Sequence, residues 1–336
     1  MKIGNFDTAS NVLVIAEIGN NHEGDFELAK RLIDAAADAG AHAVKFQSIS
    51  PEKLVDPTQL TRLEQLRRFQ FSVEQFAELS SHAAMSGVIF MSTPFDMDAV
   101  DYLKPLVPAF KIASGDNDNL PLLRAVARTG KPVIMSTGLA DLAQVRRSKA
   151  VIEEIWEKEG ISGGLALLHC VVSYPTEPQD AHLTAIHDLK ALGCSVGYSD
   201  HTIGIDAAVL AVAMGARIIE KHFTIDKNHS DFRDHQLSAD PQDLTELVRR
   251  VEEAQVFLGE GEKRVLDCEK GNKGVRRSIY AERDLEAGHE LTPGDLICLR
   301  STEGIPSSEF DAVVGKQLLV SVKQGRLLSM SDLKGM

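Results

Sequence analysis

The sequence predicts a (β/α)8 TIM barrel followed by a small β-rich domain. Short apolar segments rich in β-branched residues alternate with amphipathic helical segments over roughly the first 250 residues, as barrel strands and helices do. Nearly every apolar segment ends in polar, chemically capable side chains. Active sites of such barrels lie at the C-terminal ends of the strands, so this pattern predicts where the chemistry occurs as well as the fold.

Eight segments have the length and composition of buried parallel strands: Val12–Ile18, Ala43–Gln47, Val88–Ser92, Ala109–Ile112, Pro132–Ser136, Leu165–His169, Ser195–Ser199 and Ile218–His222. Helices are predicted between them at Asp25–Ala39, Ser72–Met85, Pro121–Arg128, Asp141–Glu159, Ile205–Met214 and Pro241–Leu258. Ser72 is a typical helix N-cap, and Asp240 before Pro241 is a second start signal.

A doubly wound open sheet is the rival fold. A dinucleotide-binding sheet carries a Gly-x-Gly-x-x-Gly turn after its first strand, but here Ile18 is followed by Gly-Asn-Asn-His-Glu-Gly. The barrel is therefore favoured.

The chain divides into three parts. Residues 1–258 form the predicted barrel, and residues 259–275, with four glycines and alternating charges, form a predicted linker. Residues 276–336 contain short strands and turns without a helical period. This last part is so small that we expect it to lean on the barrel or on another subunit.

The composition excludes some classes of function. The 336 residues carry a formal charge of −13, which argues against nucleic acid or an anionic membrane as the main partner. Cys170, Cys194, Cys268 and Cys298 show no metal-type spacing. The N-terminus lacks the apolar segment of a signal peptide, and no run is long enough to span a membrane. We expect a cytoplasmic protein.

Two histidines are candidate metal ligands. His201 and His222 follow neighbouring predicted strands, and each has an acidic neighbour, Asp200 or Glu220. A single histidine in such a place is more often a buried core residue. The pair predicts one shared divalent metal ion, with coordination positions left for substrate.

Two lysines end otherwise apolar strands. A buried ammonium group needs an anionic partner, so Lys45 and Lys111 are predicted to face a carboxylate or a bound anion. Salt bridges to Glu17 or Asp116 are the structural interpretation, and a phosphate or carboxylate clamp is the functional one. A third interpretation is a Schiff-base lysine of a class I aldolase, with Lys111 or Lys221 as the candidate.

A set of motifs in the same order resembles the bacterial sialic acid synthase (N-acetylneuraminate synthase) family. In the first part these are Ala16-Glu17-Ile18-Gly19-Asn20-Asn21-His22-Glu23-Gly24, Val44-Lys45-Phe46-Gln47, Ser92-Thr93-Pro94-Phe95, Phe110-Lys111-Ile112-Ala113-Ser114-Gly115-Asp116, Ser136-Thr137-Gly138, Leu168-His169-Cys170 with Tyr174-Pro175, Gly197-Tyr198-Ser199-Asp200-His201-Thr202 and Glu220-Lys221-His222-Phe223-Thr224. The region from Arg276-Arg277-Ser278 to Asp332-Leu333 resembles that family's antifreeze-like (SAF) domain.

The resemblance implies that phosphoenolpyruvate condenses with an N-acetylmannosamine-type sugar to give a nine-carbon 2-keto acid sugar and phosphate. It implies a metal ion on His201 and His222, for which manganese is preferred and magnesium or cobalt are alternatives. Glu17 would orient the water or stabilise the positive charge that develops on the enol carbon.

The resemblance also implies which of the two substrates each remaining site residue contacts. Those expected at phosphoenolpyruvate are Lys45, Thr93, Lys111, Ser114, Ser136 and Ser199. Those expected at the sugar are Gln47, Asp116, Tyr174 and Asp234, together with Arg300 from the small domain of the second subunit. The expected assembly is a domain-swapped homodimer.

Three positions depart from the sialic acid branch of the family. Asp116 stands where that branch has Glu, Val172 where it has Asn, and Phe46 where it has His. With the Phe232-Arg233-Asp234-His235 stretch, these changes point to another acceptor, such as a legionaminic, pseudaminic or spore-coat sugar precursor. The competing hypotheses are the class I aldolase and a carbohydrate- or ice-binding module on an inactive barrel.

Overall fold

The chain forms two compact units, Met1–Gly259 and Glu260–Met336. The computed structural model describes residues 1–259 and 261–335. Among these residues, no helix is both long and apolar enough to cross a lipid bilayer.

The first unit is an eight-stranded parallel barrel, as predicted. Its strands are β3 (Leu13–Gly19), β4 (Ala43–Ser48), β5 (Ile89–Pro94), β6 (Phe110–Ile112), β7 (Val133–Ser136), β8 (Leu165–Cys170), β9 (Ser195–Asp200) and β10 (Ile218–His222). The hydrogen-bonded order is β5-β4-β3-β10-β9-β8-β7-β6. The two end strands, β5 and β6, lie next to each other, so the sheet is nearly closed.

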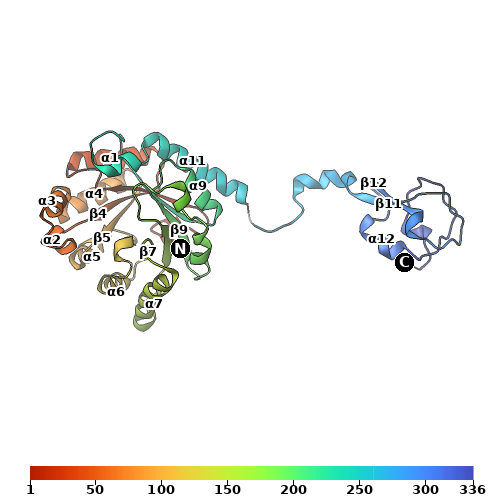
Figure 1. Cartoon of the computed structure of the whole chain (residues 1–336), viewed down its shortest axis with the longest axis horizontal. Coiled ribbons are helices and arrows are strands. Elements are labelled where there is room, and N and C mark those ends of the chain that lie inside the picture. Colours follow the sequence, from red (N-terminus) through yellow and green to blue (C-terminus); the bar gives the residue numbers. More distant parts are fainter. Residues whose placement is uncertain (260, 336) are drawn as a thin grey trace. The chain divides into compact units, whose positions relative to one another are not determined.

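Helices surround the strands, as Figure 1 shows. Six of them match predicted helices: α1 (Phe26–Asp38), α4 (Val73–Met85), α6 (Leu120–Arg128), α7 (Leu142–Glu159), α9 (Asp206–Ala213) and α11 (Pro241–Leu258). The predicted caps at Ser72 and Asp240 are present, because each side chain accepts a hydrogen bond from a backbone N–H in the first helical turn.

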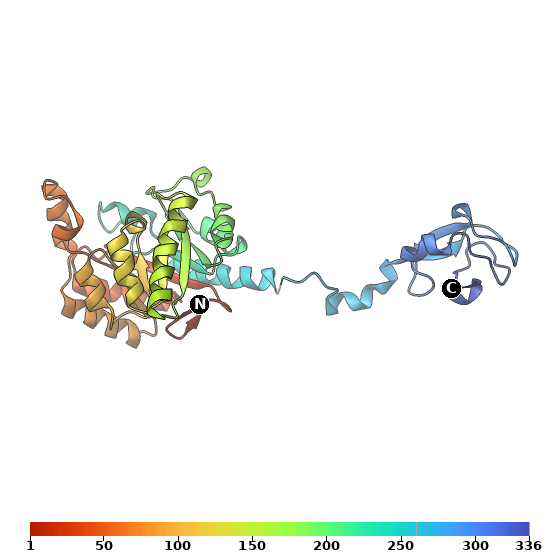
Figure 2. The same cartoon turned by 90° about the horizontal axis from the view of Figure 1, so that it is seen from below.

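Five further helices of this unit were not predicted from the sequence, namely α2 (Pro51–Leu54), α3 (Leu60–Phe69), α5 (Met97–Leu103), α8 (Ala185–Lys190) and α10 (Arg233–Leu237). Helices α2 and α3 follow β4, and they project at one end of the barrel, in orange-red in Figure 2.

The barrel interior changes from apolar to polar along the strands. Its apolar layer contains Ile3, Leu13, Ile15, Ala43, Met91, Ala109, Ile134, Ala166, Leu168 and Ile218. Side chains two residues apart on a strand share a face, so the next inward positions are two residues further along. These positions hold polar groups, namely Glu17, Lys45, Thr93, Lys111, Ser136, Cys170 and Glu220. The alternation therefore places the polar groups together above a dry core.

An N-terminal hairpin, absent from the sequence prediction, closes the opposite end of the barrel. It consists of β1 (Lys2–Ile3) and β2 (Phe6–Asp7). Ile3 is fully buried and packs against the apolar layer of the interior. Figure 2 shows the N-terminus at the end of the barrel away from α2 and α3.

The second unit has its own core around one antiparallel strand pair, β11 (Arg277–Ala281) and β12 (Leu296–Arg300). It also contains the short helix α12 (Phe310–Val313) and several 3₁₀ turns. Part of the predicted linker, Asp267–Val275, is such a 3₁₀ segment, labelled η3.

Two turns of the second unit share the same hydrogen-bond arrangement, which was not predicted from the sequence. Asp295 accepts hydrogen bonds from the backbone N–H and the hydroxyl of Thr292, at 2.8 and 2.7 Å. Asp332 accepts the corresponding two bonds from Ser329, at 2.9 and 2.8 Å. Both carboxylates are buried, so these capped turns anchor the loops of a unit that has few strands.

Candidate active site

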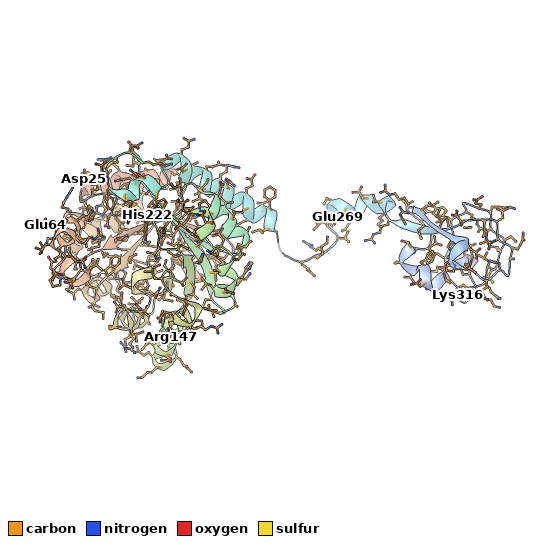
Figure 3. All side chains as sticks on the ribbon, in the orientation of Figure 1. Asp25, Glu64, Arg147, His222, Glu269 and Lys316 are labelled. Atoms are coloured by element: carbon orange, nitrogen blue, oxygen red, sulfur yellow. The ribbon has the colours of Figure 1, made fainter. Side chains whose placement is uncertain are left out.

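A cavity of about 300 Å³ opens at the C-terminal ends of the barrel strands. Figure 3 labels His222, one of its lining residues, within the barrel. Most of the site residues predicted from the sequence line this cavity: Glu17, Lys45, Gln47, Thr93, Lys111, Ser114, Ser136, Tyr174, Ser199, His201, His222 and Asp234.

Asp116 and Arg300 are the exceptions. Asp116 does not line the cavity, although its neighbours Ser114 and Gly115 do, and its carboxylate accepts a hydrogen bond from Asn119 at 3.2 Å. Asp116 therefore lies next to the lining of the cavity, and its contact with the sugar stays a prediction. Arg300 is an exposed residue of β12 in the second unit.

Two lysines and two glutamates form a buried charge network on the cavity floor. The Lys45 ammonium nitrogen lies 2.7 Å from Oε2 of Glu17 and 3.7 Å from Oε2 of Glu220. The Lys111 ammonium nitrogen lies 3.6 Å from Oε1 of Glu220. The salt bridge predicted for Lys45 with Glu17 is therefore present, and Glu220 is the acid that Lys45 and Lys111 share. From the sequence, Glu220 was named only as an acidic neighbour of His222 and not as a partner of the lysines, although its position two residues before His222 puts it on the same inward face.

Burial and charge shift the pKa values of this network in different directions. Burial lowers the pKa of Lys111, although Glu220 opposes the shift. Burial also raises the pKa of Glu17, partly offset by the charge of Lys45. The pKa of Glu220 is held below its ordinary value, because Lys111 and Lys45 together outweigh the effect of burial. The floor therefore combines buried cations with a carboxyl group that is poised to take up a proton.

Hydroxyl groups surround the two ammonium groups. Lys111 donates a hydrogen bond to Ser136 Oγ at 2.7 Å, and Lys45 donates one to Thr93 Oγ1 at 3.1 Å. Ser199 donates its hydroxyl proton to Oε1 of Glu220 at 2.9 Å. Ammonium and hydroxyl donors held in fixed positions on a buried surface suit the recognition of a small polyanion.

His201 and His222 lie side by side at the cavity, with ring centroids 5.5 Å apart. His201 Nδ1 is 2.8 Å from the carbonyl oxygen of Val171. A carbonyl oxygen only accepts, so Nδ1 carries a proton, and Nε2 is the nitrogen with the lone pair whenever this imidazole is neutral. The buried Nδ1 of His222 has no hydrogen-bond partner within the described ranges.

The histidine pair fits a divalent metal ion. Burial, reinforced by the charges of His201 and Lys45, lowers the pKa of His222 well below its ordinary value. His222 is thus a neutral imidazole, which is the form that binds metals. Residues 1–259 and 261–335 contain no group of three or more His, Cys, Asp or Glu side chains able to hold a metal. Any ion at the pair would need oxygen ligands from water or substrate.

Tyr174 and Arg233 form one wall of the cavity. The Tyr174 ring centroid lies 4.2 Å from that of His201, and the Arg233 guanidinium carbon lies 4.8 Å from the Tyr174 ring centroid. Arg233 also lies 3.5 Å from a carboxylate oxygen of Asp234. From the sequence, Arg233 was named only within the Phe232-Arg233-Asp234-His235 stretch that points to another acceptor, without a role of its own.

The three residues that differ from the sialic acid branch of the family lie in different places. Val172 lines the cavity, so its apolar side chain changes the surface offered to a ligand. Phe46 does not, because it packs in the core around the barrel, with its ring centroid 5.7 Å from that of Phe90. The interpretation of Phe46 as an acceptor-specific change was therefore wrong, since it lies on the opposite face of β4 from Lys45.

Lys221 is also outside the cavity. Its ammonium group lies 2.9 Å from Asp200 Oδ2, and its side chain is almost fully buried on the outer face of β10. Lys221 therefore forms a structural salt bridge with Asp200 and is no candidate for a Schiff base at this site.

The loops after β3 and β10 are tied together at the cavity mouth. Asn21 donates hydrogen bonds to the carbonyl of Phe223 at 2.8 Å and to Ser238 Oγ at 3.0 Å. Glu23 accepts from Ser230, and its Oε1 lies 3.2 Å from His235 Nε2. These contacts hold the segment that carries Arg233 and Asp234.

The fold and the cavity define a (β/α)8-barrel protein with a basic, histidine-bearing pocket and a separate small β-rich unit. Residues 32–263 match the NeuB family and residues 276–334 match the SAF domain. The chain belongs to the NeuB family, whose members include sialic, legionaminic and pseudaminic acid synthases.

Several relatives match nearly the whole chain. The N,N'-diacetyllegionaminic acid synthase of Legionella pneumophila is 40% identical, over 94% of this chain and 92% of that protein. The pseudaminic acid synthase of Campylobacter jejuni is 32% identical, over 99% of each chain.

Solved structures agree with this assignment. The N-acetylneuraminic acid (sialic acid) synthetase of Leptospira borgpetersenii has a TM-score of 0.76 at 36% identity, covering 81% of this chain and 94% of that one. The spore coat polysaccharide biosynthesis protein of Bacillus subtilis has a TM-score of 0.68 at 30% identity, covering 100% and 99%.

Proposed function

We propose that this protein condenses phosphoenolpyruvate with an N-acetylmannosamine-type sugar to form a nine-carbon 2-keto acid sugar and phosphate. The observation that carries the proposal is the pair of buried ammonium groups, Lys45 and Lys111, beside the neutral imidazole of His222 in one cavity. Phosphoenolpyruvate is a small polyanion that such a floor can bind, and the histidine pair offers a place to activate the aldehyde.

The lysines and hydroxyls are assigned to phosphoenolpyruvate. Lys45, Lys111, Ser136 and Ser199 provide the donors for its phosphate and carboxylate groups, with Thr93 and Ser114 at the same cavity. A bound anion would give both lysines a further negatively charged partner beside Glu220.

The reaction forms one carbon–carbon bond and breaks one carbon–oxygen bond. The methylene carbon of phosphoenolpyruvate attacks the aldehyde carbon of the sugar, whose oxygen takes up a proton. Water then adds to the enol carbon, and phosphate leaves with its bridging oxygen as the 2-keto group forms. Glu17, whose pKa burial raises despite the charge of Lys45, is assigned to orient that water and to accept its proton.

A divalent metal ion on His201 and His222 would polarise the aldehyde oxygen when bound. Two imidazoles and oxygen donors suit manganese, with magnesium or cobalt as alternatives. Because the Val171 carbonyl oxygen accepts from Nδ1 of His201, Nε2 of that ring would be the nitrogen that binds the ion.

The acceptor is placed against Tyr174, Gln47 and Asp234, all of which line the cavity. Gln47 donates a hydrogen bond to Glu17 at 3.2 Å, which would connect acceptor binding to the water-orienting carboxylate. Val172 makes this surface less polar than in the sialic acid branch, so di-N-acetylated legionaminic- or pseudaminic-type precursors belong in the acceptor panel together with N-acetylmannosamine.

A homodimer completes the proposal. Arg300 is assigned to the acceptor site of the second subunit, as the family resemblance implies. Its exposed place on β12 leaves its guanidinium group available for such a contact.

The experiment is product analysis by mass spectrometry after incubating purified protein with phosphoenolpyruvate, Mn²⁺ and each sugar of the panel. The proposal predicts a product that contains all three phosphoenolpyruvate carbons without its phosphate. A class I aldolase would instead be trapped by borohydride at Lys111, because Lys221 is outside the cavity. A trapped adduct with no metal requirement would overturn the proposal.

A further inference from the structure

The outer face of the barrel sheet holds a buried ion pair at the ends of β9 and β10. Lys221 and Asp200 are partners in the parallel register of these strands, and the Lys221 ammonium nitrogen lies 2.9 Å from Asp200 Oδ2. Their side chains are only 1% and 0% exposed. The neighbouring outward residues, Tyr198 and Ile219, pack in the apolar layer between the strands and the helices. An ion pair is costly in such a layer, so its presence requires an explanation other than packing.

Both members of this ion pair also bind the main chain of Thr202, the residue that follows His201. Asp200 Oδ1 accepts a hydrogen bond from the Thr202 N–H at 2.8 Å. The Lys221 ammonium group donates one to the carbonyl oxygen of Thr202. The N–H belongs to the peptide group that joins His201 to Thr202. The ion pair therefore fixes the main chain directly after His201, through charged hydrogen bonds that are stronger than neutral ones.

His201 is held from the loop after β8 as well. Its carbonyl oxygen accepts a hydrogen bond from the Thr176 N–H at 2.9 Å, and its Nδ1 lies 2.8 Å from the Val171 carbonyl oxygen. These two contacts fix the ring and one side of the main chain. Asp200, the acidic neighbour of His201 in the sequence, binds the main chain after His201 and leaves the ring to Val171. The ion pair thus supplies the part of the support for His201 that the β8 loop does not.

We propose that Asp200 and Lys221 are positioning residues, which fix the main chain at His201 so that its ring can bind the divalent ion that the histidine pair shares. The inference rests on the proposed function, because it requires a divalent ion at that pair. Neither positioning residue lines the cavity, so both act through His201 and not on substrate. Two apolar side chains of similar size could fill the same space, but they could not bind the N–H and carbonyl groups of Thr202. Substitution can therefore separate packing from positioning.

The test is Mn²⁺ binding to full-length protein without substrates, measured by electron paramagnetic resonance, together with thermal unfolding. The central variant combines Asp200→Val with Lys221→Met, which leaves no buried charge without its partner. We expect its unfolding temperature to stay close to that of the wild type, because apolar residues can replace a buried ion pair without loss of stability. Its Mn²⁺ dissociation constant should rise about tenfold, as for loss of groups that orient a metal ligand. Lys221→Met alone should weaken Mn²⁺ binding and also lower the unfolding temperature, because the Asp200 carboxylate is then buried without a cation.

Ile3→Ala is the matched control for loss of stability. Ile3 is fully buried at the opposite end of the barrel, so this variant should unfold at a lower temperature and keep the wild-type Mn²⁺ affinity. Wild-type Mn²⁺ affinity in the double variant would overturn the inference, and so would a wild type that binds no Mn²⁺. Equal weakening in Ile3→Ala would also overturn it, because affinity would then follow stability alone. Sugar-dependent product from the wild type, with unchanged Mn²⁺ affinity in the double variant, would leave the proposed function standing while the inference fails.

Discussion

The ammonium nitrogen of Lys45 lies 2.7 Å from Oε2 of Glu17, and both side chains are almost completely buried. Burial raises the pKa of Glu17, while the charge of Lys45 opposes that shift. Such a pair is costly to place in a core, so its presence at the strand ends is better explained by chemistry than by stability.

Replacing Glu17 tests its role directly. Glu17→Gln keeps the size of the side chain but removes the carboxylate, so we expect turnover to fall by about 10²–10⁴-fold, as for loss of a general base. Thermal unfolding should show that the barrel remains folded. Glu157→Gln, on the exposed face of α7, is the control and should keep wild-type activity. A Glu17→Gln enzyme with more than a tenth of the wild-type rate would remove Glu17 from the mechanism.

The histidine pair can be tested by metal binding as well as by activity. His201→Ala and His222→Ala should each lower Mn²⁺ affinity by at least tenfold, because each removes one of two protein ligands, and both should abolish turnover. Electron paramagnetic resonance titration measures the bound Mn²⁺. His187→Ala changes an exposed histidine of α8 and should leave the titration unchanged. Wild-type Mn²⁺ affinity in His222→Ala would contradict the assignment.

Subunit mixing tests the proposed role of Arg300. If Arg300 acts in the site of the second subunit, Arg300→Ala and Glu17→Ala chains are both inactive alone. Mixed dimers contain one complete site, so an equal mixture should recover roughly a quarter of the wild-type rate. Native mass spectrometry confirms that subunits have exchanged. No recovery after demonstrated exchange would place Arg300 outside the partner's site.

The contacts between Glu23 and the segment after β10 should affect binding of the acceptor sugar and not binding of phosphoenolpyruvate. Glu23→Ala removes the contacts with Ser230 and His235, which loosens the segment that carries Asp234. We expect the KM for the sugar to rise about tenfold, as for loss of a charged hydrogen bond, with the KM for phosphoenolpyruvate unchanged. Glu23→Gln should restore most of the loss. Equal increases in both KM values would indicate a general loss of structure.

Asp295 makes the second unit sensitive to acid. His289, Thr292 and Arg283 outweigh the effect of burial and hold the pKa of the Asp295 carboxyl well below its ordinary value. A carboxyl whose pKa is lower in the folded than in the unfolded state stabilises the fold above the unfolded pKa, near 3.9. That contribution is lost as the pH falls from there toward the folded pKa.

Hydrogen exchange of residues 276–335 checks this prediction. Protection should decrease below about pH 4, where Asp295 would be protonated in the unfolded state. At neutral pH, Asp295→Asn should destabilise the unit by about 2 kcal/mol, because an amide NH₂ group cannot accept the two hydrogen bonds that one Asp295 carboxylate oxygen accepts from Thr292. Asp284→Asn, which changes an exposed acid, is the control and should have little effect. Unchanged protection in Asp295→Asn would show that the capped turn does not hold this unit together.

The sequence predicted the barrel because its signal is local and repeated. Each strand is a short apolar run that ends in polar groups, and period-two alternation brings Glu17, Lys45 and Lys111 onto one inward face. The histidine pair could be predicted for the same reason, because His201 and His222 lie at the ends of β9 and β10, which are neighbouring strands.

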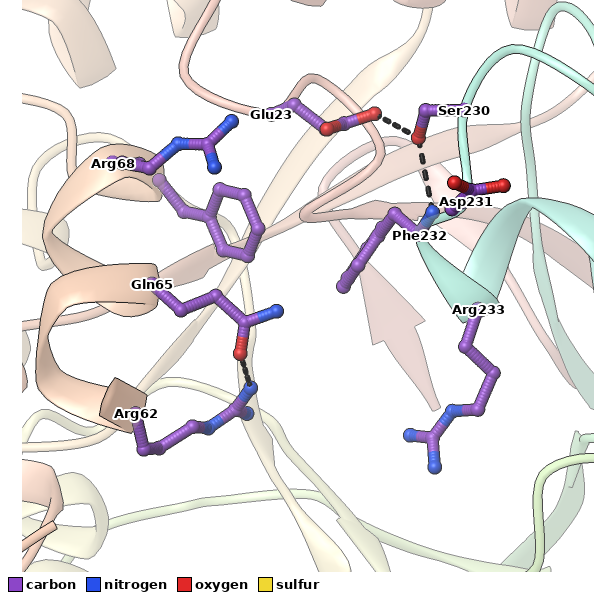
Figure 4. Close-up of a pocket in the computed structure, with 9 residues that line it drawn as sticks. Glu23, Arg62, Gln65, Arg68, Ser230, Asp231, Phe232 and Arg233 are labelled. Atoms are coloured by element: carbon purple, nitrogen blue, oxygen red, sulfur yellow. Dashed lines mark hydrogen bonds between the residues drawn. The ribbon is translucent and has the colours of Figure 1, made fainter.

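Other features depend on contacts between distant segments, which a single sequence does not display. Glu220 forms ion pairs with Lys45 and Lys111 only after three strands that are distant in the chain, β4, β6 and β10, are assembled. A further cavity, shown in Figure 4, forms where α3 faces Arg233, which is more than a hundred residues away in the chain. The outward orientation of Phe46, between two inward residues of β4, could have been read from the alternation but was overlooked.

Phosphate release from phosphoenolpyruvate is the most direct test of the proposed reaction. Purified, Mn²⁺-loaded protein is incubated with phosphoenolpyruvate and one amino sugar at a time, and inorganic phosphate is measured. The account predicts release that requires a sugar, stops with chelator and disappears in Lys111→Met, in which a floor cation is removed. Release without any sugar, or no release with any N-acetylmannosamine-, legionaminic- or pseudaminic-type acceptor, phosphorylated or not, would contradict it.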